Sequence, residues 1–407
     1  MGNRFQELHL EGLVNFKTGK LNSNAAKPDG MFPFFTCSQE TFRTDTWSFD
    51  GEYVLLGGNN AAGIYPLKYF NGKFDAYQRT YAINTIDENV LVTRYVYYAL
   101  RLQLEVMKSI STGVATKFLT LSLLNRTKIP VPPLPTQHKI ASILSAYDEL
   151  IENNTRRIKI LEEMAQSIYR EWFVNFRYPE HEKAKMVDSP LGMIPEGWGV
   201  KHIGEIAKVK GGKRLPKGRI IQDEVTNHPY LRVVDFADSG LDRSSIKYID
   251  EETHLSISRY VISNTDIYIS IAGTIGRVGS IPNDLSGANL TENAAKICEI
   301  QSSVSKHYLL HFLHSDNGRA QIASKTVGTS QPKLALFRIQ EVMLAIPPTH
   351  LIHQSEAIFS DYSNMIENLR TRNITICQTR DLLLPRLISG EIDVTDLDIQ
   401  VPEELSQ

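Results

Sequence analysis

The hydrophobic and polar positions of the chain follow patterns typical of both strands and helices. Short apolar runs bounded by Gly, Asn and Asp, such as GEYVLLGG (residues 51–58) and TYAINTI (80–86), predict β-strands. Apolar residues at helical spacing predict a helix over residues 92–110. Residues 261–281 predict two further strands around a glycine-rich turn. The chain is therefore expected to be an α+β protein.

Two longer segments carry apolar residues seven apart, the pattern of a coiled-coil seam. The first begins after IPVPPLP (residues 129–135), whose prolines end any strand, and Thr136 can cap it. About 38 residues at about 1.5 Å each would span roughly 57 Å. We expect the two helices to pair through the seam residues Leu144, Tyr147, Ile151, Ile158, Leu161, Ile168, Phe359, Tyr362, Ile366, Leu369, Ile376 and Leu383.

Polar residues interrupt both seams. Asn154 interrupts the first, where a buried polar side chain can fix the register of a pair. Asn373 and Arg380 interrupt the second, which we therefore expect to be the weaker seam. Pro385 and Gly390 are expected to end the second helix.

The chain repeats itself. Residues 132–157 (PPLPTQHKIASILSAYDELIENNTRR) and 347–372 (PPTHLIHQSEAIFSDYSNMIENLRTR) share identical residues at a constant offset, 347 − 132 = 215. LEGLVNFKTGKL (10–21) aligns with IGEIAKVKGGKR (203–214) at an offset of 203 − 10 = 193. These matches predict two globular blocks, each followed by a long helix. The two helices are expected to pair as an antiparallel coiled coil with pseudo-two-fold symmetry.

Composition excludes several classes of protein. The chain has no run of about 18 apolar residues, so no membrane span is expected. Cys37, Cys298 and Cys377 lie far apart, which fits a reducing cytoplasmic location and gives no metal site. The net charge of −2 counts against nucleic-acid binding by bulk electrostatics alone.

Sequence signatures of catalysis are missing. The chain has no GxxxxGK[ST], HExxH or GxSxG motif. AGTIGRVG (272–279) has its glycines three apart between two predicted strands, and a turn explains it better than a cofactor site. His138 and His353 recur at one position of both repeats, where a packing role is favoured over a catalytic or metal role. We expect a protein that binds and positions, with no catalytic residue and no metal.

Four motifs in order resemble the specificity subunits of type I restriction–modification enzymes. They are PPLPTQHKIASILSAYDELIENN, LEEMAQSIYREWFVNF (161–176), LGMIPEGW (191–198) and RDLLLPRLISGEI (380–392). The resemblance covers nearly the whole chain. One departure is that family members often begin with a segment like IPEGW, which stands here only before the second block.

The resemblance implies a non-catalytic subunit that binds double-stranded DNA. Each block would be a target-recognition domain for one half of an asymmetric two-part sequence. The helices would set the spacer and dock two copies of a methyltransferase subunit that binds S-adenosylmethionine. Restriction subunits using ATP and Mg would join as translocase and nuclease, and this chain would hold no cofactor.

The repeat and the resemblance together give the expected domain boundaries. They are 1–134 for the first recognition domain, 135–178 for the central helix, 179–197 for a linker, 198–347 for the second recognition domain, 348–390 for the C-terminal helix and 391–407 for a frayed acidic tail.

Candidate DNA contacts lie in basic, glycine-flanked loops, because Arg and Lys bind phosphates and guanine. KVKGGKRLPKGR (208–219) is the densest positive run of the chain. For each residue, a solvated surface loop is the alternative. The candidates are Lys17, Lys20, Lys27, Arg79 and Lys117 in the first block and Lys210, Lys213, Arg214, Lys217, Arg219, Arg277, Gln331 and Lys333 in the second.

Two other functions compete with this one. The near-neutral charge and the apolar seams also fit a coiled-coil scaffold that joins two protein-binding domains without nucleic acid. A stand-alone enzyme is the third hypothesis, and the missing motifs argue against it.

Overall fold

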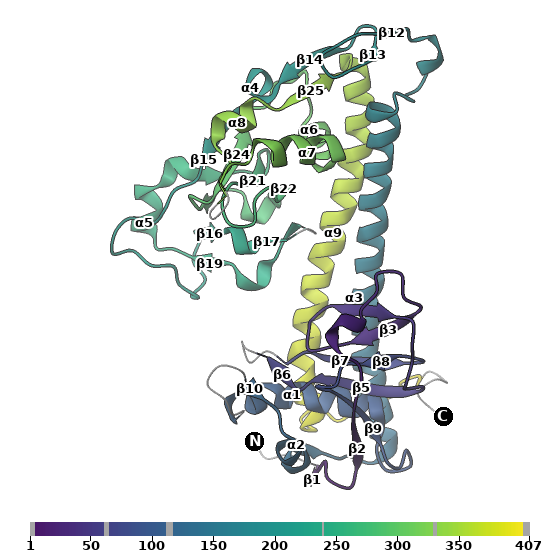
Figure 1. Cartoon of the computed structure of the whole chain (residues 1–407). Helices are drawn as coiled ribbons and strands as arrows, with labels where there is room; N and C mark the ends of the chain where they lie inside the picture. The colour runs from purple at the N-terminus through teal and green to yellow at the C-terminus, as the bar shows by residue number, and fades with distance from the viewer. Residues whose placement is uncertain (1–4, 61–64, 111–116, 238–239, 329–331, 402–407) are drawn as a thin grey trace. The chain divides into compact units, whose positions relative to one another are not determined.

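Two compact units make up the computed structural model (Figure 1). One comprises Met1–Asn154 with Thr371–Gln407, and the other comprises Thr155–Arg370. The long helices α3 (Leu134–Tyr169) and α9 (Thr349–Ile388) each contribute to both units. The structure describes residues 5–60, 65–110, 117–237, 240–328 and 332–401.

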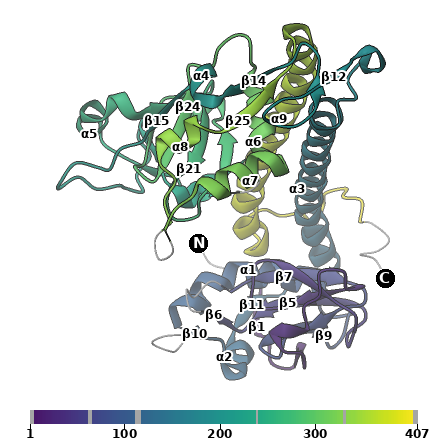
Figure 2. The same cartoon turned by 45° about the horizontal axis from the view of Figure 1, so that its top comes forward.

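The first unit is built on a four-stranded antiparallel sheet with the strand order β2-β9-β5-β7. Helix α1 (Thr93–Ile110) packs against β5 and β7 (Figure 2). These elements confirm the two strands and the helix predicted from the apolar runs of this block. The strand bounds are Val14–Thr18 for β2, Thr80–Thr85 for β9, Glu52–Gly57 for β5 and Leu67–Asn71 for β7.

Smaller elements complete this unit. Strands β1 and β11 pair antiparallel, and the three-stranded sheet β4-β3-β8 contains one parallel pair, β3 with β8. Strand β6 pairs with β10, which precedes the short helix α2. Their bounds are Glu7–His9, Lys128–Pro130, Thr41–Thr44, Phe32–Phe35, Asp75–Ala76, Asn59–Asn60, Lys117–Phe118 and Leu121–Arg126, in the order named.

The second unit repeats this topology. Its antiparallel sheet has the order β15-β24-β21-β22, its two-stranded pair is β14–β25, and its third sheet, β19-β16-β23-β20, again contains one parallel pair, β16 with β23. The repeat in the sequence is therefore a repeat of strand order. The bounds are Lys208–Gly211, Ala294–Cys298, Ile267–Ser270, Val278–Ser280, Gly199–His202, Met343–Ile346, Lys247–Tyr248, Pro229–Leu231, Ala288–Leu290 and Val261–Ile262, in the order named.

The glycine-rich turn predicted in residues 261–281 joins β21 to β22. Gly273 and Gly276 adopt positive φ angles of 77° and 84°, so the motif is a hairpin turn. Helices α6 and α7 pack on one another, and α6 also contacts β22. Further helices and strands of this unit are α4 (Ile203–Ile206), α5 (Glu251–Ser256), α6 (Lys306–His314), α7 (Asp316–Lys325), α8 (Leu336–Gln340), β17 (Phe236–Ala237) and β18 (Gly240–Leu241).

Equivalent glycines follow the first strand of each main sheet. A Cβ at Gly19 would lie 1.8 Å from the carbonyl oxygen of Ala76, and one at Gly212 would lie 2.0 Å from that of Thr291. Both backbones therefore approach too closely for any side chain. The aligned pair Gly19/Gly212 thus has a structural reason in both copies.

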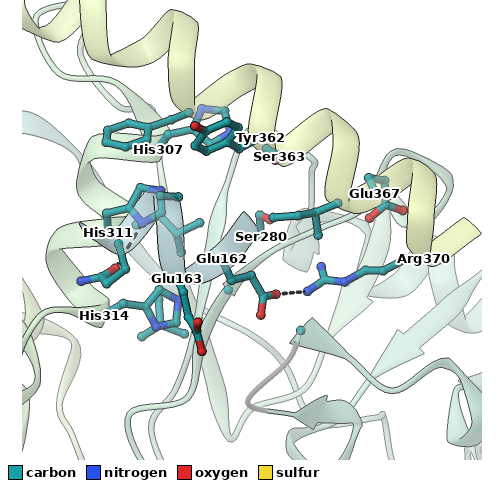
Figure 3. Close-up of a pocket in the computed structure, with 18 of the residues that line it drawn as sticks. Glu162, Glu163, Ser280, His307, His311, His314, Tyr362, Ser363, Glu367 and Arg370 are labelled. Atoms are coloured by element: carbon teal, nitrogen blue, oxygen red, sulfur yellow. Dashed lines mark hydrogen bonds and ion pairs between the residues drawn. The ribbon is translucent and has the colours of Figure 1, made fainter. Parts of the chain in front are cut away.

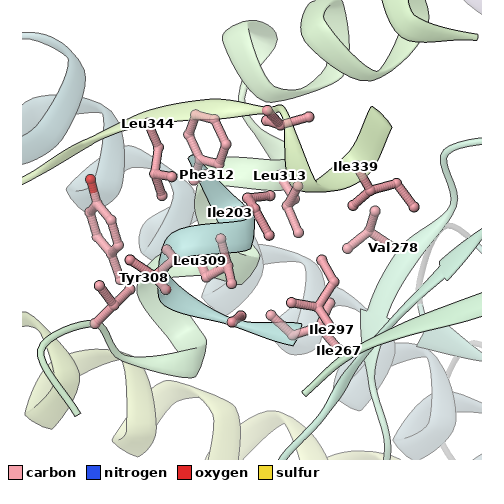
Figure 4. Packing of buried hydrophobic residues seen from close by; sticks show 14 of the residues in the cluster. Ile203, Ile267, Val278, Ile297, Tyr308, Leu309, Phe312, Leu313, Ile339 and Leu344 are labelled. Atoms are coloured by element: carbon pink, nitrogen blue, oxygen red, sulfur yellow. The ribbon is translucent and has the colours of Figure 1, made fainter. Parts of the chain in front are cut away.

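Each unit has its own hydrophobic core, finished by parts of both long helices. In the first unit, Leu144 of α3 and Leu384 and Leu387 of α9 lie in the core. In the second, Ala165 of α3 and Phe359 of α9 pack with the cluster that Figure 4 shows around Ile203, Leu309 and Leu344. Each buried Leu or Phe side chain among them contributes about 1.5–3 kcal/mol.

The helices pair antiparallel within each unit. In the first unit, Asp148 of α3 accepts a hydrogen bond from Arg380 of α9 (2.5 Å), and Asn154 Nδ2 donates to Asn373 Oδ1 (2.8 Å). In the second unit, Arg370 of α9 binds Glu162 of α3 (2.7 Å). The partner number falls as the α3 number rises, which confirms the predicted antiparallel arrangement.

The polar residues of the seams have partners on the opposite helix. Asn373 and Arg380 were expected to weaken the second seam, but one bonds to Asn154 and the other to Asp148. Both polar positions therefore have partners, and the lower strength of the second seam stays a prediction.

The helix ends differ from the prediction. Helix α3 begins at Leu134, and Thr136 lies inside its first turn, where its amide donates to the Pro133 carbonyl (2.9 Å). Pro385 lies inside α9, on an exposed position, and the helix continues to Ile388 before Gly390 (φ 76°). At Pro385 the missing amide removes one hydrogen bond without ending the helix.

The segments expected to be a linker and a tail are partly ordered. In the linker, β12 (Met186–Val187) pairs with β13 (Ile194–Pro195). In the tail, the carbonyls of Thr395 and Leu397 accept from Lys139 of α3 (2.7 and 2.9 Å), and Val394 is buried in the core of the first unit. The prediction of a frayed tail is therefore wrong for residues 391–401.

No helix in the described ranges is both long enough and apolar enough to cross a membrane.

Candidate nucleic-acid interface

Backbone hydrogen bonds bring four loops of the first unit together. The Gly19 amide donates to the Thr80 carbonyl (3.3 Å), and the Gly58 amide donates to that of Arg79 (2.7 Å). The Leu119 amide then donates to the Gly58 carbonyl (2.8 Å). The end of β2, the start of β9, the loop after β5 and the segment before α2 therefore meet. They carry the predicted candidates Lys20, Arg79 and Lys117.

The second unit makes the same three contacts. The Gly212 amide donates to the Ala294 carbonyl (2.9 Å), and the Ile271 amide donates to that of Asn293 (2.8 Å). The Leu334 amide donates to the Ile271 carbonyl (3.0 Å). We call each of these groups of four joined loops a loop cluster. The cluster of the second unit carries the candidates Lys213, Arg214 and Lys333.

In the first unit, the side chains of Lys17, Lys20 and Arg79 are exposed. Lys17, Lys20 and Arg79 form no ion pair with the residues that the structure describes. The guanidinium of Arg79 lies 5.9 Å from the ring centre of Phe118. The fourth candidate, Lys27, binds Asp45 (2.5 Å).

The fifth candidate of this unit, Lys117, is in β10, and its side chain lies outside what the structure describes.

In the second unit, carboxylates offset most of the predicted basic run. Lys210 binds Glu299 (2.6 Å), and Arg214 binds Glu292 (2.7 Å). Hydrogen bonds from Lys208 and Lys210 lower the pKa of Glu299 to about 2, so this carboxylate stays charged.

Of the other candidates in this unit, some contact protein partners and others are exposed without an ion pair. Arg219 pairs with Asp250 and Glu252, and Lys213 lies over the Tyr260 ring (5.6 Å from its centre). Arg277 is half-buried and donates to the Phe236 carbonyl, which holds its loop. Lys217 and Lys333 are exposed and form no ion pair within the described ranges, and Gln331 lies outside those ranges.

Sequence reasoning missed Glu292 and Asn293. They stand in LTENAAKICEI, directly before β24, and the backbone contacts make Asn293 the equivalent of Arg79. A polar pair directly before an apolar strand was the available signal. Only the fold reveals that the carboxylate faces Arg214, 78 positions away in sequence.

The twelve predicted seam residues are all buried or half-buried. Other large apolar side chains of the same helices face solvent instead. Leu150, Ile160, Met164 and Met365 expose between 44 and 53% of their surface. We call these four the outer apolar positions, which the seam pattern did not single out.

A cavity of about 330 Å³ lies in the second unit where α6 meets α3 and α9 (Figure 3). His307 binds Glu356 of α9 (2.8 Å), and His311 donates to Gln166 of α3 (3.3 Å). Burial lowers the pKa of His311 to about 3, so its ring is neutral at pH 7. Figure 3 shows the Glu162–Arg370 pair in the same wall. The cavity thus lies at the attachment of α6 to both helices.

The recurring histidines differ in their surroundings. His138 is half-buried and His353 is exposed. No group of three His, Cys, Asp or Glu side chains could hold a metal ion within the described ranges.

Comparison with known proteins gives consistent matches. The family model described as the type I restriction modification DNA specificity domain matches residues 3–163 and 195–378. The type I restriction enzyme MjaIX specificity subunit of Methanocaldococcus jannaschii is 30% identical over 77% of this chain and 72% of its own length. The EcoDI specificity subunit of Escherichia coli is 22% identical over 95% and 88%.

The fold is also that of a solved specificity subunit. The crystal structure of a type I restriction-modification system S subunit from M. genitalium matches with a TM-score of 0.60. It is 18% identical, and the match covers 95% of this chain and 96% of that one.

Proposed function

The chain belongs to the family of type I restriction–modification specificity subunits, and from this premise we propose that it selects an asymmetric, two-part DNA sequence. Each unit reads one half of that sequence through its loop cluster. The observation that carries the proposal is that one backbone arrangement recurs in both units with different side chains. Equivalent backbones place both readers alike, and different side chains give the two halves different sequences.

Exposed lysines of both units supply phosphate contacts. No carboxylate in the described ranges forms an ion pair with Lys17, Lys20, Lys217 or Lys333. These side chains are therefore available to bind phosphates. Lys27, Lys117, Lys210, Lys213 and Arg219 remain further candidates. The net charge of −2 fits a complex in which partner subunits provide much of the remaining phosphate contact.

The helices are the docking element of the proposal. Two methyltransferase subunits bind there, and the outer apolar positions supply part of the contact surface. S-adenosylmethionine belongs to those subunits, and ATP and Mg belong to restriction subunits that join the complex. This chain contributes target choice and no catalytic group.

Methylation sequencing tests the proposal. The chain is co-purified with its methyltransferase, and unmodified genomic DNA is methylated and read at single-molecule level. We expect one two-part motif with an unspecific spacer. Methylation at unrelated sequences would refute sequence selection by this chain.

The scaffold without nucleic acid is the competing function, favoured by the ion pairs that offset the basic run of the second unit. A variant with Lys17, Lys20, Lys217 and Lys333 changed to Glu separates the two. We expect it to assemble with the methyltransferase but to lose DNA binding. The matched control is Lys185→Glu, an exposed lysine outside both clusters. Unchanged DNA affinity of the fourfold variant would favour the scaffold.

A further inference from the structure

A charged pair stands at the surface of the second loop cluster. Arg214 Nε donates to Glu292 Oε1 at 2.7 Å, and the Arg214 side chain is 81% exposed. The other carboxylate oxygen of Glu292 accepts from the Thr291 hydroxyl (3.0 Å). One carboxylate oxygen of Glu292 is thus fixed by Thr291, while the other accepts the hydrogen bond from Arg214.

The ion pair leaves the two terminal guanidinium nitrogens of Arg214 available for other hydrogen bonds. The hydrogen bond uses Nε, and the two terminal nitrogens have no partner in the described part of the chain. Burial opposes ionisation of Glu292, but the hydrogen bond from Arg214 lowers the pKa of its carboxyl below the usual value. Both groups therefore keep their charges, and the guanidinium fork is oriented outward.

The side chains around the Arg214–Glu292 pair suit contact with base edges better than contact with a phosphate. The pair lines a cavity of about 420 Å³ together with Asn293 and Val234, which is 67% exposed. A phosphate at Arg214 would face the Glu292 carboxylate, and like charges repel. Base edges, in contrast, present acceptors, donors and thymine methyl groups side by side.

One base pair matches an adjacent Arg and Glu. In the major groove, guanine offers the acceptors N7 and O6, and its paired cytosine offers the N4 amino donor. The terminal nitrogens of an arginine donate to the first two, and a carboxylate accepts from the third. A·T pairs carry a donor where guanine has O6, so they cannot satisfy the fork.

We propose that Arg214 and Glu292 together read one G·C base pair in the half-site bound by the second unit, with Arg214 on guanine and Glu292 on cytosine. This inference rests on the proposed function. It adds the identity of two specificity-determining residues and of the base pair that they select.

The first unit provides an internal contrast. The position of Arg214 corresponds to Leu21, and that of Glu292 corresponds to Gln78. The backbone amide of Gln78 donates to the Leu21 carbonyl (3.0 Å). The same site on the backbone therefore carries no charged pair. This base-pair preference belongs to one half-site only.

Methylation profiling of a randomised DNA library by the complex with the methyltransferase tests the inference. For Arg214→Ala we expect preference for one G·C pair in one half-site to fall roughly 10- to 100-fold, with the other half unchanged. Arg214→Lys keeps the charge but loses the fork, and should not restore the preference. Lys217→Gln, a nearby control, should weaken all sequences alike.

A gain of function sharpens the test. The double variant Leu21→Arg, Gln78→Glu should introduce a G·C preference into the other half-site. A uniform loss at all sequences for Arg214→Ala, with the motif intact, would overturn the inference, because that is the signature of a phosphate contact. A wild-type complex without any motif would refute the proposed function instead, so the two failures are distinguishable.

Discussion

The two loop clusters share a backbone and differ in electrostatics. In the first unit, Lys17 and Lys20 are exposed and unpaired within the described ranges. Their counterparts in the second unit are Lys210, which is bound to Glu299, and Lys213, which lies over the Tyr260 ring. The dense basic run of the second unit is thus partly neutralised by carboxylates, among them Glu299 and Glu292. The local charge of a folded protein depends on which carboxylates the fold places beside the basic residues. Counting basic residues along the sequence does not detect these carboxylates.

The largest expected effect comes from the equivalent glycines. Gly19→Ala and Gly212→Ala should each destabilise their own unit by about 4 kcal/mol, because the new Cβ would collide with a backbone carbonyl. Hydrogen exchange resolved by peptide would report the loss in one unit at a time. Gly199→Ala is the control, since its Cβ meets nothing within 4 Å. Equal stability of Gly19→Ala and Gly199→Ala would contradict the close approach.

The next largest effect is expected at the ion pairs between the helices, where the cost in stability should depend on burial. Arg380→Met removes a guanidinium that is only 9% exposed and leaves Asp148 with its hydrogen bond from Tyr98 but without its cation, at a cost of about 3 kcal/mol. Arg370→Met removes a pair whose members are 30 and 40% exposed, at a cost below about 1 kcal/mol. Urea unfolding midpoints of the two variants measure the difference. Similar losses would mean that burial does not separate the two pairs.

Acid should affect the second unit through His311. Its pKa is lowered to about 3 in the folded chain against about 6.5 when unfolded, so the unfolded chain takes up the proton first. Stability therefore falls as pH drops below about 6.5, by about 2 kcal/mol at pH 5. His311→Gln should unfold with a weaker pH dependence between pH 5 and 7.

His307, His314 and Glu356 also act on this ring and remain in that variant, so the comparison isolates His311. His353→Gln, at an exposed site, is the control and should keep the wild-type pH dependence. An identical pH profile for His311→Gln and the wild type would rule out the role of this residue.

The smallest effect concerns equivalent lysines of the two clusters. Lys17→Gln in the methyltransferase complex should reduce the slope of log affinity against log salt by about 1, as expected for one phosphate contact. Lys210→Gln should change that slope less, because Glu299 already offsets the charge. Fluorescence anisotropy on duplex DNA at several salt concentrations measures both slopes. A larger change for Lys210→Gln would reverse the comparison.

Local patterns predicted much of the fold. Apolar spacing predicted β5, β9, α1 and the antiparallel helices, and the offset of 215 predicted the repeated topology. The helix ends and the docked tail were missed, because Pro385 fits an exposed helical position and Lys139 contacts Thr395, 256 positions away. The sequence also supplied most site candidates, but their carboxylate partners come from distant segments that spacing cannot reveal.

The docked segment at residues 391–401 has a consequence for the order of events during synthesis. The second unit is contiguous, so all of its residues are synthesised before residue 371. The first unit is assembled from residues up to 154 and from residue 371 onward, and Lys139 waits for Thr395 and Leu397. A chain interrupted after residue 370 would contain every residue of the second unit, whereas the first unit would lack Leu384, Leu387 and Val394 from its core.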